Sequence, residues 1–218
     1  MRARGLLIVG IGGIAASLLL GVAGVASGWM SGWSFGTPGT MMGSVFGGGG
    51  RDIGMDRAVT IAQSVATSSS SGGLAADEVI EFSNNYYASI RDKSTQIGAF
   101  EILIDRSNGN VVREPGPDIM WNTKYSVMGG GMMGGFGFRN LGPMTVTAQQ
   151  AQDVAQRWLD ANQSGTTAKS ADPFYGYYTV DFERDGTLVG MLSVNGYSGQ
   201  VWYHTWHGSY IAMRDLGT

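Results

Sequence analysis

Two segments of this chain, separated by about 90 residues, share one pattern, and this internal repeat constrains the fold more than any other feature. Each segment begins with apolar residues at positions i, i+3, i+4, i+7 and i+8, the pattern of a helix that packs on one side. A strand pattern with paired tyrosines and then a turn with glycine follow in both. The offset between the copies changes only from 93 residues in the helix to 90 in the last strand. The chain is therefore predicted to contain two similar units.

The second copy shows the pattern most clearly. Thr147 and Gln150 have the spacing of a capping box, which begins a helix. Apolar and polar residues alternate over residues 178–183, which predicts a strand, and Asp185-Gly186 predicts a two-residue hairpin turn. A last strand is expected over residues 200–207. We expect an α+β fold in which each unit is one amphipathic helix packed on a small antiparallel sheet.

The second copy resembles the PepSY domain, a small extracytoplasmic module. The resemblance rests on the helix, on "YYTVDF" and on a D/N-x-x-[S/T]-G-x-V turn, here Asn195, Ser198, Gly199 and Val201. In the first copy the same turn consists of Asp105, Asn108, Gly109 and Val111. The resemblance covers about residues 146–206 and, more weakly, 56–114. It implies a module that binds or restrains a partner and does not catalyse, without an attached peptidase domain, because no H-E-x-x-H motif is present.

The N-terminal part of the chain carries almost no charge. No Asp, Glu, Lys or Arg occurs between Arg4 and Arg51, and residues 6–26 are apolar except for Ser17. A helix of 21 residues is just long enough to cross a hydrocarbon core of about 30 Å. Because Arg2 and Arg4 precede it, we expect a single-pass membrane protein with a cytoplasmic N-terminus and an extracytoplasmic body. The body would be secreted if this segment were a cleaved signal peptide, but its length favours an uncleaved anchor.

These patterns divide the chain into five predicted regions. They are a cytoplasmic tip and transmembrane anchor over 1–27, a Gly/Trp/Met-rich linker over 28–54, a first PepSY-like unit over 55–127, a Met/Gly-rich loop over 128–145 and a second unit over 146–218. Within the anchor, Gly13, Ser17 and Gly21 recur every four residues and favour close packing of membrane helices.

His204 and His207 are the two histidines of the chain and have the spacing H-x-x-H. On a strand, residues three apart point to opposite faces, so one imidazole is expected to pack on tryptophans and the other to face solvent. The alternative is a copper or zinc site. The Met/Gly-rich loop supplies thioether ligands suited to Cu(I), namely Met128, Met132 and Met133. We expect no cofactor, with copper as the alternative.

No catalytic residue is predicted. Asp181 and Glu183 share the face of their strand that is expected to be solvated, and neither histidine comes with a nucleophile motif. Cysteine is absent, which excludes thiolate chemistry and disulfides. From Arg51 onward, 12 basic residues oppose 17 acidic ones without a basic stripe, which argues against nucleic acid as a partner.

The predicted function is therefore that of a non-catalytic, membrane-anchored protein that acts by protein–protein contact, as an accessory subunit of a membrane complex. Its expected partners are the lipid bilayer and a protein at the membrane. The predicted interaction surface consists of aromatic side chains: Trp202, Tyr203, Trp206, Tyr210, Phe136 and Phe138. Two alternatives stay open, copper handling through the methionines and histidines, and inhibition of an exported peptidase.

Overall fold

A computed structural model describes residues 51–69, 72–126 and 142–217. The predicted membrane anchor, most of the linker and most of the Met/Gly-rich loop lie outside the described residues. The same holds for several predicted site residues, namely Gly13, Ser17, Gly21, Met128, Met132, Met133, Phe136 and Phe138.

The described chain forms a helix followed by four strands, and then repeats this order. The first set is α2 (Met55–Ser69), β1 (Leu74–Phe82), β2 (Asn85–Asp92), β3 (Gly98–Asp105) and β4 (Val111–Arg113). The second set is α4 (Ala148–Asn162), β5 (Thr167–Phe174), β6 (Tyr177–Arg184), β7 (Thr187–Asn195) and β8 (Val201–Tyr203). A short helix, α3 (Pro117–Met120), follows the first set, and strand β9 (Tyr210–Asp215) follows the second.

Within the described residues, all nine strands belong to one sheet, in the order β8-β7-β6-β5-β3-β2-β1-β9, with β4 paired to β3 off this path. Strands within each set pair antiparallel. The two halves of the sheet meet where β5 runs parallel to β3, through the single residue pair Gly98 and Phe174. Strand β9 returns to the first half and pairs antiparallel with β1. The seam between β3 and β5 is thus the least extensive pairing in the sheet.

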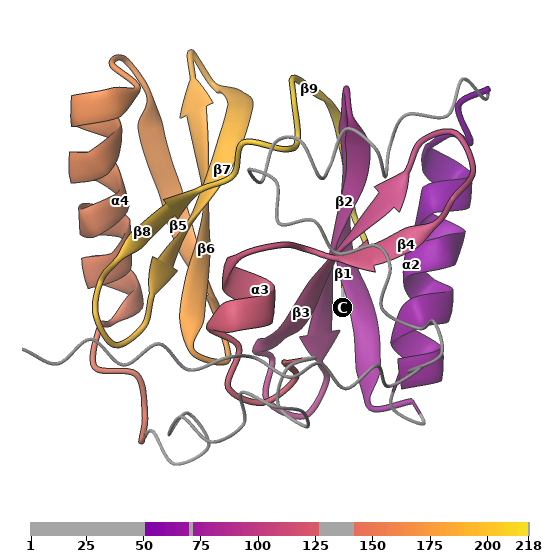
Figure 1. The fold of residues 1–218 in the computed structure, drawn as a ribbon, viewed down its shortest axis with the longest axis horizontal. Coiled ribbons are helices and arrows are strands. Elements are labelled where there is room, and N and C mark those ends of the chain that lie inside the picture. The colour runs from indigo at the N-terminus through magenta and orange to yellow at the C-terminus, as the bar shows by residue number, and fades with distance from the viewer. Residues whose placement is uncertain (1–50, 70–71, 127–141, 218) are drawn as a thin grey trace, which may run out of the picture. The chain divides into compact units, whose positions relative to one another are not determined.

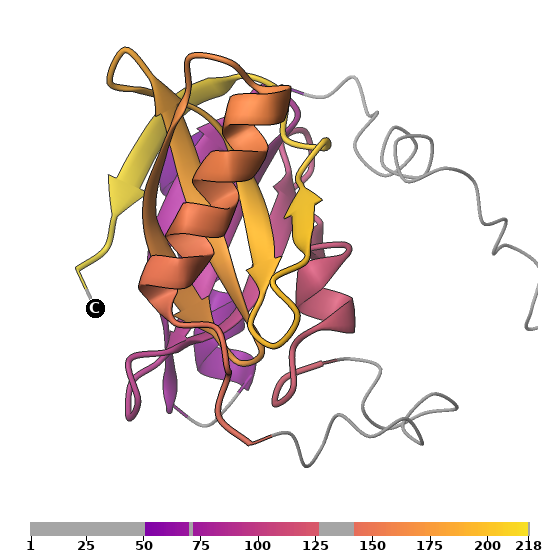
Figure 2. The ribbon, with the colours of Figure 1, turned by 90° about the vertical axis from the view of Figure 1, so that its left-hand side faces the viewer.

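The two long helices cover the outer faces of the two halves, and the strands lie between them (Figures 1 and 2). Alanines on α2 and α4 let the helices approach their strands, and two separate apolar clusters result. A third cluster joins side chains of both halves: Ile80, Phe82, Tyr87 and Leu103 from the first, Leu188 and Met191 from the second, and Trp206. The inner faces of the two half-sheets therefore pack on each other.

Several local predictions are confirmed. Thr147 and Gln150 form both reciprocal hydrogen bonds of the capping box. Asp185 and Gly186 have φ values of 51° and 76°, as the tight hairpin turn requires. The glycine of each D/N-x-x-[S/T]-G-x-V turn, Gly109 and Gly199, also has positive φ.

The predicted assembly was wrong. We expected two units with separate small sheets, whereas one sheet runs through both. The first strand of each set, β1 and β5, was not predicted, and β5 joins the halves. The division at residues 55, 128 and 146 stays a prediction.

The fold and location predictions that rest on a transmembrane helix are also contradicted. No helix of the described residues is long and apolar enough to cross a membrane. Helices α2 and α4 have 15 residues each, which gives about 22 Å of length, and both have a polar face. The predicted single-pass topology, with a cytoplasmic N-terminus, therefore has no counterpart in this structure.

Gly98 is expected to be essential for the contact between the halves. A Cβ atom at this position would lie 2.4 Å from the ring of Phe174. We expect Gly98→Ala to lower the free energy of unfolding by roughly 1–3 kcal/mol, which corresponds to about 2–10 °C in Tm. Gly142→Ala is the control, because no atom lies within 4 Å of the added methyl. Equal melting temperatures for the two variants would contradict this role.

Candidate metal centre

Glu114, His204 and His207 form a buried cluster in which the three side chains are at most 2% exposed. Glu114 directly follows β4, and His204 directly follows β8. The predicted strand ends at Tyr203 and not at residue 207, so the chain turns and brings both imidazoles to the same side, with ring centroids 5.5 Å apart. The expectation that one ring faces solvent therefore does not hold.

Three donor atoms converge in this cluster. Oε1 of Glu114 lies 3.1 Å from Nε2 of His207 and 3.4 Å from Nδ1 of His204, and the two nitrogens are 3.4 Å apart. In a tetrahedral zinc site with bonds of about 2.0–2.1 Å, neighbouring ligand atoms are about 3.3 Å apart. The three atoms are thus spaced like three corners of such a tetrahedron.

The outer nitrogen of each ring is held by a neighbouring polar side chain. Nε2 of His204 lies 2.9 Å from the Ser193 hydroxyl, and Nδ1 of His207 lies 3.1 Å from Oδ1 of Asn85. The Asn85 amide nitrogen donates to the Trp206 carbonyl at 3.0 Å, so the amide oxygen accepts from Nδ1 of His207. In a neutral His207 ring, Nδ1 then carries the proton and the lone pair of Nε2 points to the centre of the cluster. Histidines that bind metals have this arrangement, in which the other ring nitrogen donates a hydrogen bond to a neighbouring group.

The carboxylate of Glu114 has one satisfied oxygen. Oε1 accepts a hydrogen bond from Nε1 of Trp206 at 3.0 Å, whereas Oε2 is buried and has no hydrogen-bond partner among the described residues. A buried carboxylate oxygen without a partner is costly, and coordination of a cation would satisfy it. With Oε2, the cluster offers four donor atoms.

Burial by itself would raise the pKa of Glu114, but the charges and hydrogen bonds of His204 and His207 outweigh burial and hold this pKa well below its usual range. Burial lowers the pKa of His207, against the opposing effect of Glu114. Burial therefore favours the neutral form of the His207 imidazole, which is the form that coordinates metals.

A second buried carboxylate, Glu101 on β3, lies close to this cluster. Its oxygens accept hydrogen bonds from the hydroxyl groups of Tyr87 at 2.6 Å, Tyr177 at 2.7 Å and Thr179 at 2.7 Å. Burial raises the pKa of Glu101 well above its usual range, and the negative charge of nearby Glu114 adds to this effect. Because Tyr177 and Thr179 belong to β6, Glu101 connects the two halves of the sheet.

Both histidines were predicted as candidate ligands, whereas Glu114 was not. The repeat contained a signal for it, because the offset of 90 residues in the last strand maps His204 onto Glu114. The structure shows this equivalence directly: each residue follows the short strand that pairs with the third strand of its half, β4 with β3 and β8 with β7.

The aromatic side chains predicted as an interaction surface pack within the chain where they are described. Trp206 is buried and bonded to Glu114. Trp202 meets Trp121 edge to face at 6.0 Å, Tyr203 stacks on Trp158 at 5.3 Å, and Tyr210 meets Phe82 edge to face at 6.4 Å. Their aromatic character thus serves packing in this structure.

No family model and no curated protein matches this chain. A solved structure, the Bacillus megaterium YpeB C-terminal domain, is similar to it at 14% sequence identity with a TM-score of 0.25. The match covers 70% of this chain and spans 62% of the length of that one. A likeness of this degree carries no argument about function, and membership of the PepSY family stays a prediction.

Glu101→Gln is expected to make stability less dependent on pH. The pKa of Glu101 is raised in the folded state, whereas an unfolded glutamate titrates near its ordinary value of about 4.3. The wild type therefore loses stability as pH rises above about 4, and glutamine cannot titrate. Urea unfolding should show the variant gaining about 1–3 kcal/mol relative to wild type between pH 4 and pH 8. If the free energy of unfolding depended on pH in the same way for the two proteins, Glu101 would not be protonated in the folded state.

Proposed function

We propose that this protein binds a metal ion of the zinc class through Glu114, His204 and His207. The observation that carries the proposal is the triangle of donor atoms, 3.1–3.4 Å on each side. Two imidazoles and one carboxylate are ligands that Zn²⁺ accepts in tetrahedral geometry. Square-planar Cu(II) favours neighbouring donors about 2.9 Å apart, so the triangle fits zinc better.

The proposed site is structural and not catalytic. A catalytic zinc site keeps one position open to substrate, whereas these three side chains are at most 2% exposed. The ion would join Glu114 of the first half to the segment between β8 and β9. That segment already hydrogen-bonds to the first half, since the backbone nitrogens of Ser83 and Asn84 donate to the carbonyls of Ser209 and His207 at 2.8 and 3.1 Å. Metal binding would therefore stabilise the pairing of β9 with β1.

A non-catalytic role agrees with the expectation from the sequence. Action through a protein partner and inhibition of a peptidase stay predictions that no described contact favours. Copper binding is tested in the same experiment as zinc, because His204 and His207 take part in both hypotheses.

Metal titration of the full, chelator-treated chain by calorimetry tests the site. We expect one Zn²⁺ per chain with a Kd of about 1 µM or below. Glu114→Gln, His204→Ala and His207→Ala should each weaken binding at least about 100-fold, since each removes a ligand. Glu183→Gln is the matched control, because it makes the same substitution at a glutamate that pairs with Lys169 outside the triangle and should leave the affinity unchanged.

Two results would overturn the zinc proposal. One is binding by Glu114→Gln as tight as that of the wild type, and the other is absence of stoichiometric binding by the wild type. Tighter binding of Cu(I) than of Zn²⁺ would favour the copper alternative.

Ser193 is expected to orient His204 for metal binding. Its hydroxyl lies 2.9 Å from Nε2 of His204 and is fully buried. Loss of such an outer hydrogen bond typically weakens metal affinity 10–100-fold, so we expect Ser193→Ala to raise the Kd for zinc by roughly this factor without a change in stoichiometry. Ser89→Ala is the control, because Ser89 is also a buried serine but is not bonded to either histidine. Similar zinc affinities for the two variants would remove Ser193 from the site.

A further inference from the structure

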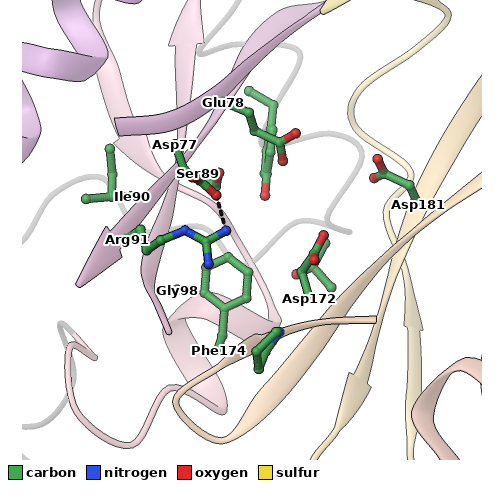
Figure 3. Close-up of a pocket in the computed structure, with 12 residues that line it drawn as sticks. Asp77, Glu78, Ser89, Ile90, Arg91, Gly98, Asp172, Phe174 and Asp181 are labelled. Atoms are coloured by element: carbon green, nitrogen blue, oxygen red, sulfur yellow. Dashed lines mark hydrogen bonds and ion pairs between the residues drawn. The ribbon is translucent and has the colours of Figure 1, made fainter. Parts of the chain in front are cut away.

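An acidic cleft, separate from the histidine cluster, lies where the two halves of the sheet meet. Figure 3 shows the carboxylates of Glu78, Asp172 and Asp181 pointing into the same space, from β1, β5 and β6. The cavity between these side chains is small, about 20 Å³, which is room for about one water molecule or ion. Asp181 was expected on a solvated face, but the first half of the sheet covers that face.

The carboxyl groups that line this cleft outnumber the cationic side chains that line it. Asp77, which also lines the cleft, forms an ion pair with Arg91. For Glu78, Asp172 and Asp181, no Lys, Arg or His of the described ranges lies within ion-pair distance. The nearby Lys169 pairs instead with Glu183, at 3.7 Å. Three carboxyl groups from both halves thus share a cleft in which the lining cation, Arg91, is paired with Asp77.

The pKa values reflect this imbalance. Burial raises the pKa of Glu78 to about 8, and the charges of Asp181, Asp172, Asp77 and Asp215 add to the effect. Burial raises the pKa of Asp181 to about 7, where Asp172 adds to the shift and Lys169 opposes it. Near neutral pH these groups therefore hold protons that a cation could replace.

The hydroxyl of Ser89 points independently to a ligand. Ser89 is only 6% exposed, it lines the cleft, and its Oγ has no hydrogen-bond partner among the described residues. It lies directly opposite Glu78 in the β1–β2 ladder, so the two side chains share a face of the sheet. A buried hydroxyl without a partner costs about 1–3 kcal/mol, and coordination to an ion would satisfy it.

We infer that this cleft binds Ca²⁺ through Glu78, Asp172 and Asp181, with the Ser89 hydroxyl and water as further ligands. Among the described residues, only Glu114, His204 and His207 already have three ligand atoms within 4.8 Å of one another, so the carboxylates of the cleft would move closer together around the ion. The donors are hard oxygens, and neither histidine nor methionine lines the cleft, so zinc and copper are disfavoured. Ca²⁺ accepts six to eight oxygen ligands in irregular arrangements, whereas Mg²⁺ demands a near-ideal octahedron. The ion would join both halves at the seam, where strand pairing is least extensive.

Thermal unfolding of the full chain at pH 8 tests this inference. We expect about 5 mM CaCl₂ to raise Tm by roughly 5 °C over NaCl of equal ionic strength, with a smaller effect of MgCl₂. Glu78→Gln and Asp181→Asn should raise Tm without calcium, because they remove unpaired charge, and should lose most of the calcium response. Ser89→Ala should show a reduced response. Glu183→Gln is the matched control, because this carboxylate of β6 is already paired with Lys169.

Two outcomes would overturn the inference. One is an equal rise in Tm with sodium, since that would reflect charge screening alone. The other is a calcium response in Glu78→Gln and Asp181→Asn that equals that of the wild type. The calcium and zinc proposals fail independently, because His204→Ala should lose zinc binding and keep the calcium response.

Discussion

Glu101 provides the hydrogen bonds that fix how the two halves of the sheet pack on each other. Its carboxyl group is fully buried on β3 and accepts from Tyr87 in its own half and from Tyr177 and Thr179 in the other. Pairing between β3 and β5 cannot set this arrangement by itself, because one residue pair joins these two strands. The apolar cluster between the halves is not directional, so the bonds to Glu101 specify the orientation that apolar contact leaves open. The histidine cluster depends on this docking, since Glu114 comes from the first half and both histidines come from the segment after β8.

The sequence was sufficient for elements whose signals are local. The capping box at Thr147 and the hairpin at Asp185 are formed by residues within four positions of each other, and both are present. Strand β5 was missed because Pro173 and two charged residues interrupt its alternation. The joining of β3 to β5 depends on edges that lie far apart in the chain, and local periodicity carries no information about which edges meet.

The candidate sites were harder to predict for the same reason. His204 and His207 were expected to diverge because the aromatic residues around them suggested a strand through residue 207, but β8 ends at Tyr203. Asp181 was predicted on a solvated face because it alternates with apolar neighbours. This alternation correctly identifies the apolar face of β6 that packs on α4. It cannot show that the other half of the sheet covers the opposite face of β6. Glu114 has no local motif, and the comparison of the two copies is the signal in the sequence that points to it.

The polar sites of this protein lie between the two half-sheets. In a single unit of one helix and one sheet, the face opposite the helix would be exposed to water, but here the two half-sheets bury these faces against each other. Polar side chains are inexpensive on such a face, but they need partners once it is buried. Glu101 obtains hydroxyl donors from the other half, and Glu114 obtains the imidazole of His204, the residue at its own equivalent position. Repulsion between two identical carboxylates would oppose the docking, so a glutamate in one copy and a histidine in the other relieves it. Ser89 and Asp181 also occupy equivalent positions on β2 and β6, but Arg91, the cation that lines their cleft, is paired with Asp77. Both places thus leave a buried oxygen without a partner, Oε2 of Glu114 in one and Oγ of Ser89 in the other, and each therefore favours an ion from solution.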